Sequence, residues 1–173
     1  MGLFLFLQWL LFFPAHLTNA LNPSIPNDAL SLLTFKPFVS FDPLNLLSEW
    51  SEKASENLCS WHGVMCGGTG ILSGRVTALN VIGLGGGELA PSVGDLSELR
   101  VLSIPGNMFS GEIPTGLGKF RRLKVLELQG NNISGRVSNE MGYLQSLSFV
   151  NLSCNALSGS IPSELYAFTL GHE

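Results

Sequence analysis

A unit of 24 residues recurs through the second half of the chain and constrains its fold more than any other feature. Asn107, Asn131 and Asn155 stand at this interval, and the residues around them keep the same phase. The matching segments are Leu102-Ser-Ile104, Leu126-Glu-Leu128 and Val150-Asn-Leu152, followed by Ser110-Gly111, Ser134-Gly135 and Ser158-Gly159. Units of this period stack side by side, and each buries apolar residues that it cannot bury alone. The spacing therefore predicts a solenoid.

Within each unit, the two apolar residues of the L-x-L pattern point inward from a short strand and the residues between them point outward. The asparagine stands where the chain leaves the strand, so its amide can satisfy nearby backbone groups. We therefore assign Asn107, Asn131 and Asn155 to a structural ladder. Four stacked strands at about 4.8 Å predict a sheet about 14 Å wide.

The first twenty residues are typical of a secretory signal peptide. The apolar run Leu3–Phe13 is eleven residues long, whereas a membrane span needs about 20. Thr18-Asn19-Ala20 suits cleavage after Ala20. No Lys or Arg precedes the run, so an uncleaved anchor is the alternative. We expect a mature chain in the secretory pathway, in the extracellular space or apoplast, or at the outer face of the plasma membrane.

Two of the three cysteines enclose a short loop. In an oxidising compartment we expect a disulfide between Cys59 and Cys66, which contributes about 2.5 kcal/mol in the chain-entropy model. Zinc binding by these cysteines and His62 is the alternative, but no fourth ligand lies nearby in the sequence. We interpret the third cysteine, Cys154, as a small side chain beside the turn asparagine, with an intermolecular disulfide as the alternative.

Local signals organise the region before the repeats. Asp28 is predicted to cap a helix that ends near Phe35, because Pro37 disfavours its continuation. Asp42-Pro43 predicts the start of a second short helix. Ser51–Asn57 is polar and predicted to be a loop. The first strand is predicted over Arg75–Val81.

The order of these segments is similar to that found in a known class of proteins. Ser110-Gly-Glu-Ile-Pro114 and Ser158-Gly-Ser-Ile-Pro162 resemble the plant-specific class of leucine-rich repeats. The C-x-W-x-G-V-x-C run Cys59–Cys66, together with the helical signal from Asp28, is similar to the amino-terminal cap of that class. Over residues 28–168 the chain resembles the outer, ligand-sensing region of plant leucine-rich repeat receptor-like protein kinases.

This resemblance implies an α/β solenoid: a right-handed superhelix with a short parallel concave β-sheet, a second short sheet, and a helical, disulfide-bonded amino-terminal cap. The expected domains are a signal peptide (1–20), the cap (21–75), about four repeats (76–168) and a truncated tail (169–173). The first repeat departs from the pattern, with Gly83 and Leu84 where the asparagine is expected. Gly171 also stands where the period predicts an apolar residue, so we expect a truncated product.

The resemblance further implies an extracellular module that binds a protein or peptide ligand, with another leucine-rich repeat receptor as a second class of partner. Kinase activity would reside in segments absent from this chain, and contact with the membrane would require a missing downstream span. Two alternatives stay open: a secreted inhibitor of cell-wall-degrading enzymes on the same repeats, and a truncated decoy or non-functional fragment.

The outward strand residues form the candidate binding face. Its residues are Val101, Ser103, Val125, Glu127, Gln129 and Phe149. An apolar stripe of Val101, Val125 and Phe149 fits a ligand site. The alternative is that these residues contact no ligand and only form part of a longer solenoid near its amino-terminal end. Asn132 and Asn151 begin glycosylation sequons, whereas Pro23 excludes Asn22. A glycan at Asn151 would cover part of this face, so we expect docking on the lateral face.

Composition and motifs argue against other classes. A net charge of -4 gives no reason to expect nucleic-acid binding. The glycines of Gly83–Gly87 miss the third position of a dinucleotide loop, and no Ser-His-Asp constellation is supported. We therefore expect no catalytic residue, cofactor or metal. The cluster of Lys119, Arg121, Arg122 and Lys124 is interpreted as a solvated face, with an acidic partner as the alternative.

Overall fold

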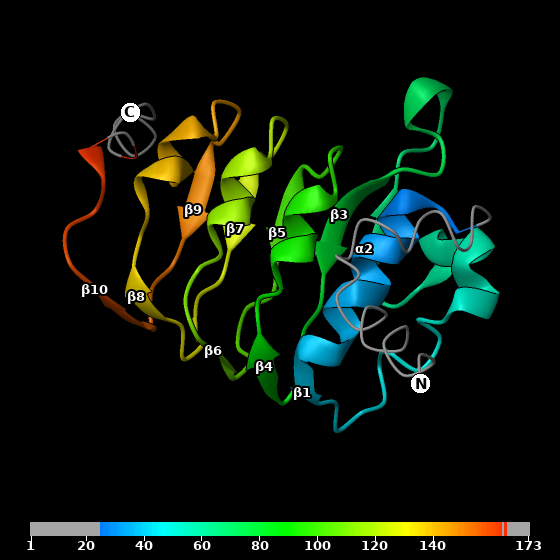
Figure 1. Cartoon of the computed structure of the whole chain (residues 1–173), viewed down its shortest axis with the longest axis horizontal. Coiled ribbons are helices and arrows are strands. Elements are labelled where there is room, and N and C mark those ends of the chain that lie inside the picture. Colours follow the sequence, from blue (N-terminus) through cyan, green and yellow to red (C-terminus); the bar gives the residue numbers. More distant parts are fainter. Residues whose placement is uncertain (1–24, 164, 166–173) are drawn as a thin grey trace, which may run out of the picture.

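Short strands stacked along one axis form the body of the molecule, and the helices of the return segments lie on the opposite side of the stack (Figure 1). The computed structural model describes residues 25–163 and 165. The predicted signal peptide (1–20) and tail (169–173) lie outside the described residues. No helix within residues 25–163 is long and apolar enough to cross a membrane.

The main sheet has five strands in the order β2-β3-β5-β7-β9. Four are parallel and belong to the repeats: β3 (Val76–Asn80), β5 (Val101–Ser103), β7 (Val125–Glu127) and β9 (Phe149–Asn151). The fifth, β2 (Val64–Cys66), comes from the cap and pairs antiparallel with β3. The predicted width of four strands was therefore too small, because five strands at about 4.8 Å span about 19 Å.

A second layer of short strands follows the turns that leave the main sheet. Strands β4 (Gly86–Glu88) and β6 (Phe109–Ser110) are parallel, and β1 (Val39–Phe41) joins them antiparallel in the order β1-β4-β6. Strands β8 (Ser134–Arg136) and β10 (Ala156–Ser158) form a separate parallel pair. The return segments contain the 3₁₀ helices η5 (Pro91–Asp95), η6 (Thr115–Lys119) and η7 (Asn139–Tyr143). A second short sheet is thus present, just before the I-P segments.

The inward residues of the strands form a continuous apolar core. Leu79, Leu102 and Leu126 are fully buried at equivalent positions of successive repeats. Aromatic side chains join this core to the cap: the ring centroids of Phe35 and Phe109 lie 6.1 Å apart, and those of Phe35 and Trp50 lie 6.2 Å apart. Because burial of an aromatic ring contributes more than burial of any other side chain, this cluster fixes the cap on the first two repeats.

The cap differs in detail from the local predictions. Its helix α2 (Asn27–Phe35) ends where expected, but the residue before it is Pro26 and no side chain caps it. Asp42 does cap backbone groups, accepting bonds from Leu46 N and Leu47 N at 2.9 Å each, yet turns follow it instead of a helix. The predicted loop after Ser51 is a kinked 3₁₀ segment. The remaining 3₁₀ helices are η2 (Lys36–Phe38), η3 (Glu52–Ser60) and η4 (Gly70–Leu72).

The asparagines bridge successive turns as the 24-residue spacing predicts. Nδ2 of Asn131 donates to the carbonyls of Ile104 and Leu128, both at 2.9 Å, and its Oδ1 accepts from Phe109 N at 3.0 Å. Asn155 repeats this arrangement one unit later. In the first repeat, which lacks the asparagine, Gly83 N donates to Oδ1 of Asn107 at 3.0 Å. The asparagine of the next repeat thus accepts a hydrogen bond from a backbone N–H of the irregular first repeat.

Candidate functional site

Five side chains on the open face of the main sheet stand in one register, and we call them the apolar row. They are Met65, Ala78, Val101, Val125 and Phe149, which pair in this order across the five strands. Met65 is 62% exposed and Phe149 47%, while the two valines are half-buried and Ala78 is nearly covered. The row is therefore a shallow apolar strip across the whole sheet, with one accessible side chain at each end.

The next register is polar, and two of its members are tied together. Ser103 Oγ donates to Glu127 Oε2 at 2.6 Å, which fixes the carboxylate beside Val101 and Val125. Ser103 itself is only 4% exposed. It was predicted as part of the accessible face, but its position under Glu127 makes it a support for that side chain. Glu127, its cross-strand neighbour Asn151 and the exposed Asn80 are left as the accessible polar groups near the row.

Two further predicted residues lie toward the end of the strands. Gln129 is half-buried, and its Oε1 has no hydrogen-bond partner among the described residues. Asn151 Oδ1 accepts from Ser153 N at 3.2 Å and from Ser153 Oγ at 2.7 Å, the arrangement of an Asx turn. Both bonds use the oxygen of the Asn151 amide, and its nitrogen takes no part in the Asx turn. Asn132, in the other sequon, is exposed.

Positively charged residues collect where the strands begin. Arg100 N donates to Thr77 O and Lys124 N donates to Arg100 O, both at 2.8 Å, so these residues are neighbours across strands. Lys119 pairs with Asp95 at 3.1 Å, and Arg122 pairs with Glu98 at 3.2 Å. In residues 25–163, Arg100, Arg121 and Lys124 form no ion pair. Part of the predicted cluster is therefore neutralised, and a basic edge remains beside the apolar row.

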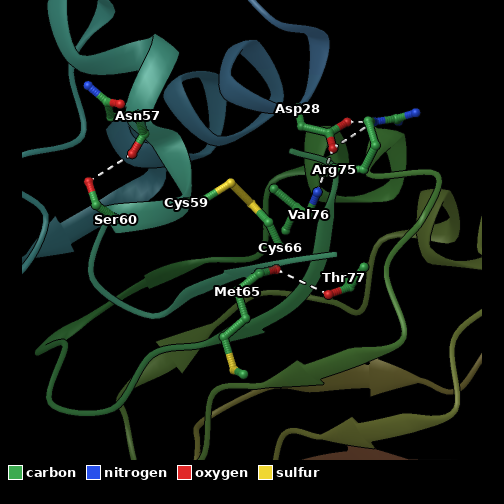
Figure 2. Close-up of a disulfide and its surroundings, with 9 residues drawn as sticks. All are labelled: Asp28, Asn57, Cys59, Ser60, Met65, Cys66, Arg75, Val76 and Thr77. Carbon is green, nitrogen blue, oxygen red and sulfur yellow. Dashed lines mark hydrogen bonds and ion pairs between the residues drawn. A yellow bond between two sulfur atoms is a disulfide. The ribbon is translucent and has the colours of Figure 1, made fainter. Parts of the chain in front are cut away.

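A disulfide anchors strand β2, and an ion pair with a buried carboxylate joins helix α2 to the start of β3 (Figure 2). Asp28 is 2% exposed and accepts three bonds: from Arg75 Nε at 3.1 Å, from Arg75 Nη2 at 3.0 Å and from Val76 N at 2.8 Å. The hydrogen bond to Asp28 raises the pKa of Arg75 above its ordinary value, against the lowering effect of burial. Cys59 and Cys66 are bonded, with an S–S distance of 1.99 Å. The predicted disulfide is confirmed, and it anchors the strand that carries Met65.

Comparison with known proteins agrees with this architecture. The family described as Leucine rich repeat N-terminal domain matches residues 25–67, and the family described as Leucine Rich Repeat matches residues 98–120, 122–144 and 146–168. The chain belongs to the leucine-rich repeat family. The first repeat, which lacks the ladder asparagine, falls between the matched segments, yet its strand β3 pairs with β5 like the others.

Relatives of this leucine-rich repeat protein include plant receptor-like kinases. It is 33% identical to Protein MALE DISCOVERER 2 of Arabidopsis thaliana over 64% of its own length, and it spans 16% of that protein. Among solved structures, it is similar to a chain of the BIR3–SERK2 complex from Arabidopsis thaliana, with 31% identity, a TM-score of 0.72 and coverage of 82% of this chain and 76% of that one. It is also similar to a chain of the PEPR1–AtPEP1 structure, with 32% identity, a TM-score of 0.72 and coverage of 82% and 20%. The matched chains are plant leucine-rich repeat ectodomains and receptors.

One residue of the apolar row was missed by the repeat pattern. Met65 lies in the disulfide loop, outside the 24-residue period, and joins the row because β2 adds to the sheet. The signal available in the sequence was the extended, β-prone run Val64-Met65-Cys66 between two glycines. Across residues 25–163 no cluster of His, Cys, Asp or Glu has the composition of a metal site.

Proposed function

We propose that this chain is an extracellular recognition module that binds a protein or peptide through the open face of the main sheet. The observation that carries the proposal is the apolar row, which crosses all five strands with Met65 and Phe149 accessible at its ends. Exposed contiguous apolar surface on a folded protein marks contact sites. The similarity to plant receptor ectodomains supports an extracellular location and a peptide or a second leucine-rich repeat ectodomain as the partner.

The geometry also limits the ligand. A sheet of about 19 Å accommodates about six residues of an extended chain at about 3.3 Å per residue. The apolar row favours apolar side chains in the bound segment. Arg100 and Lys124, which form no ion pair within the described part of the chain, favour acidic ones. Glu127, held by Ser103, disfavours an acidic group on the other side of the row. The ligand we propose is a short extended segment with apolar residues and acidic groups along one edge.

The position of Asn151 revises the expectation that a glycan there would move docking to the lateral face. Asn151 belongs to β9, the outermost strand of the sheet. Because β2 widens the sheet at the other end, a glycan on β9 leaves the strands from β2 to β7 open. We therefore propose the sheet itself as the docking surface and retain glycosylation of Asn132 and Asn151 as a prediction.

Glycosylation can be tested directly. Protein secreted from plant cells should lose apparent mass in two steps on treatment with a glycosidase, and Asn132→Gln and Asn151→Gln should each remove one step on a denaturing gel. Asn22→Gln should change nothing, because Pro23 blocks that sequon. A mobility that glycosidase leaves unchanged would contradict the prediction.

Binding should depend on the centre of the apolar row. We expect Val125→Glu to weaken binding at least tenfold, because it places a charge against apolar ligand groups and beside Glu127. Calorimetry would measure this with synthetic secreted plant peptides and with purified leucine-rich repeat ectodomains. Tyr143→Glu on η7 is the matched control, since Tyr143 is 62% exposed and lies outside the sheet. Equal binding by both variants would refute the proposed face, and no binding by any probe would refute the proposed function.

A further inference from the structure

Exposed apolar side chains lie over a strip of glycines on the second layer of strands, outside the apolar row. The strip is Gly83–Gly86, which runs from the irregular first repeat into β4. Phe41, Leu44 and Met108 lie over it and are 57%, 67% and 63% exposed. Phe41 belongs to β1 and Met108 directly precedes β6, the two strands that flank β4 in the sheet (Figure 1). We call these three side chains the glycine-strip patch.

The glycines allow these side chains to lie against the backbone. A Cβ atom on Gly85 would overlap the ring of Phe41, and one on Gly83 would be 3.3 Å from Leu44 Cδ1. A Cβ atom on Gly86 would be 3.5 Å from Met108 Cβ. The exposed area of the three side chains is on the order of 300 Å², a size at which an apolar patch on a folded protein is often functional.

The charges around the patch are mostly negative. The segments that carry and border it hold one lysine and four carboxylates, a net charge of 1 − 4 = -3; they are residues 36–49, 82–90 and 105–114. Within the described part of the chain, none of these carboxylates forms an ion pair; they are Asp42, Glu49, Glu88 and Glu112. The lysine is engaged elsewhere, because Lys36 Nζ donates to Trp50 O at 2.8 Å. The surroundings of the patch therefore favour a positively charged partner.

Two of the carboxylates lie in a column along the second layer of strands. Glu88 follows the glycine strip on β4, and Glu112 is the equivalent residue of the next repeat, 24 positions later. Both are exposed. The side chain of Glu88 lies against Gly111 and that of Glu112 against Gly135, so each carboxylate rests on a glycine of the following repeat. Two like charges held on neighbouring units attract a cationic group more strongly than either alone.

We propose that the glycine-strip patch binds a short segment of a partner protein in which apolar side chains are flanked by lysine or arginine. The apolar side chains of that segment cover the patch, and its cations lie against Glu88 and Glu112. The exposed area suits a short segment, because a standard interface between folded proteins buries about 800 Å² per partner. A second copy of the chain does not fit, since it would bring a local net charge of -3 against the same charge.

The patch and the apolar row select opposite charges. Arg100 and Lys124 beside the row favour acidic groups in its ligand, whereas the carboxylates beside the glycine-strip patch favour basic ones. The two surfaces share no residue, so the chain can hold an acidic segment and a basic segment at the same time. Binding at the glycine-strip patch does not depend on binding at the row.

Fluorescence anisotropy with labelled synthetic peptides tests the proposal on the full chain. The probe is Lys-Leu-Phe-Lys-Leu-Lys with blocked ends, and added salt should weaken its binding. We expect it to bind about tenfold more tightly than the peptide with glutamate at each lysine position. A peptide with serine at each leucine and phenylalanine position should also bind about tenfold more weakly than the probe. Equal binding of the lysine and glutamate peptides, or no binding of the lysine peptide, would overturn the proposal.

Variants of the chain locate the site. Leu44→Ser combined with Met108→Ser should weaken binding of the lysine peptide about tenfold. Glu88→Gln combined with Glu112→Gln should weaken it and reduce its salt dependence. All four side chains are exposed, so these variants should keep the fold. Met65→Ser on the apolar row is the matched control, because Met65 is 62% exposed and Met108 63%.

The Met65→Ser variant should bind the lysine peptide like the wild type. If it weakens binding as much as Leu44→Ser/Met108→Ser does, the peptide lies on the apolar row and the proposal is overturned. Binding that Leu44→Ser/Met108→Ser leaves unchanged would overturn it as well. Neither result bears on whether the apolar row binds its own ligand, which the Val125→Glu variant tests separately.

Discussion

Replacing Asp28 with alanine should lower the free energy of unfolding by about 2–3 kcal/mol, mainly because it leaves the buried N–H of Val76 without an acceptor; the side chain of Arg75 is 38% exposed, so solvent screens the loss of its partner. Asp28 is 2% exposed and holds three donors, two from Arg75 and one from Val76 N. Without its carboxylate, Val76 N stays buried with no acceptor and the guanidinium loses its counter-charge. Urea denaturation followed by the fluorescence of the buried Trp50 and Trp61 would measure the loss where the cap meets the repeats.

A second ion pair at a similar distance provides the control. Lys119 and Asp95 are 3.1 Å apart, but their side chains are 64% and 56% exposed. Asp95→Ala should therefore change the free energy of unfolding by about 1 kcal/mol or less. A Lys119–Asp95 pair worth as much as the Asp28–Arg75 pair would show that burial is not the source of the difference. Because the pKa of Arg75 is raised, its contribution to stability is fully present below its ordinary pKa and is lost as the pH rises through the raised value, in strong base.

The misassignment of Asp28 shows what local sequence rules leave out. An aspartate before an apolar periodic run predicts a helix cap, and the helix does begin there. Its carboxylate instead bonds to Arg75, 47 residues later, and to Val76 N, because the fold brings the start of β3 beside the first turn of the helix. Asp42 shows the converse, since its capping bonds form without a helix after it. A rule based on neighbours along the chain cannot predict a partner that the fold brings from another element.

The repeats were predictable to the level of single side chains, whereas the cap was not. Register follows from a fixed period, because residues 24 positions apart lie opposite each other on adjacent parallel strands. This places Val101, Val125 and Phe149 in one row from the sequence alone. Met65 and β1 could not be placed this way, since both strands join their sheets antiparallel from segments outside the period. Burial of Ser103 also escaped prediction, because it depends on the direction of the Glu127 side chain.

Replacing Asn131 with alanine should lower the free energy of unfolding by about 3 kcal/mol. The substitution leaves the carbonyls of Ile104 and Leu128 and the N–H of Phe109 without their bonds to its amide. Each unsatisfied buried group costs about 1–3 kcal/mol, and water reaches some of them because Asn131 is only half-buried. Thermal and urea unfolding of the deglycosylated protein would measure the change.

The adjacent Asn132 is the control that separates the ladder from the general effect of losing an asparagine. It is exposed and belongs to the same turn, so Asn132→Ala should stay within about 0.5 kcal/mol of the wild type. The loss in free energy of unfolding caused by Asn155→Ala should lie between the losses caused by Asn131→Ala and Asn132→Ala. Asn155 makes the same kind of bonds as Asn131, but at the last described turn, where its neighbours are more exposed. Equal losses for Asn131→Ala and Asn132→Ala would mean that the regular spacing of the ladder asparagines reflects turn geometry alone. A large loss confined to Asn131 would show that hydrogen bonds between repeats hold the stack together and keep the apolar row in register.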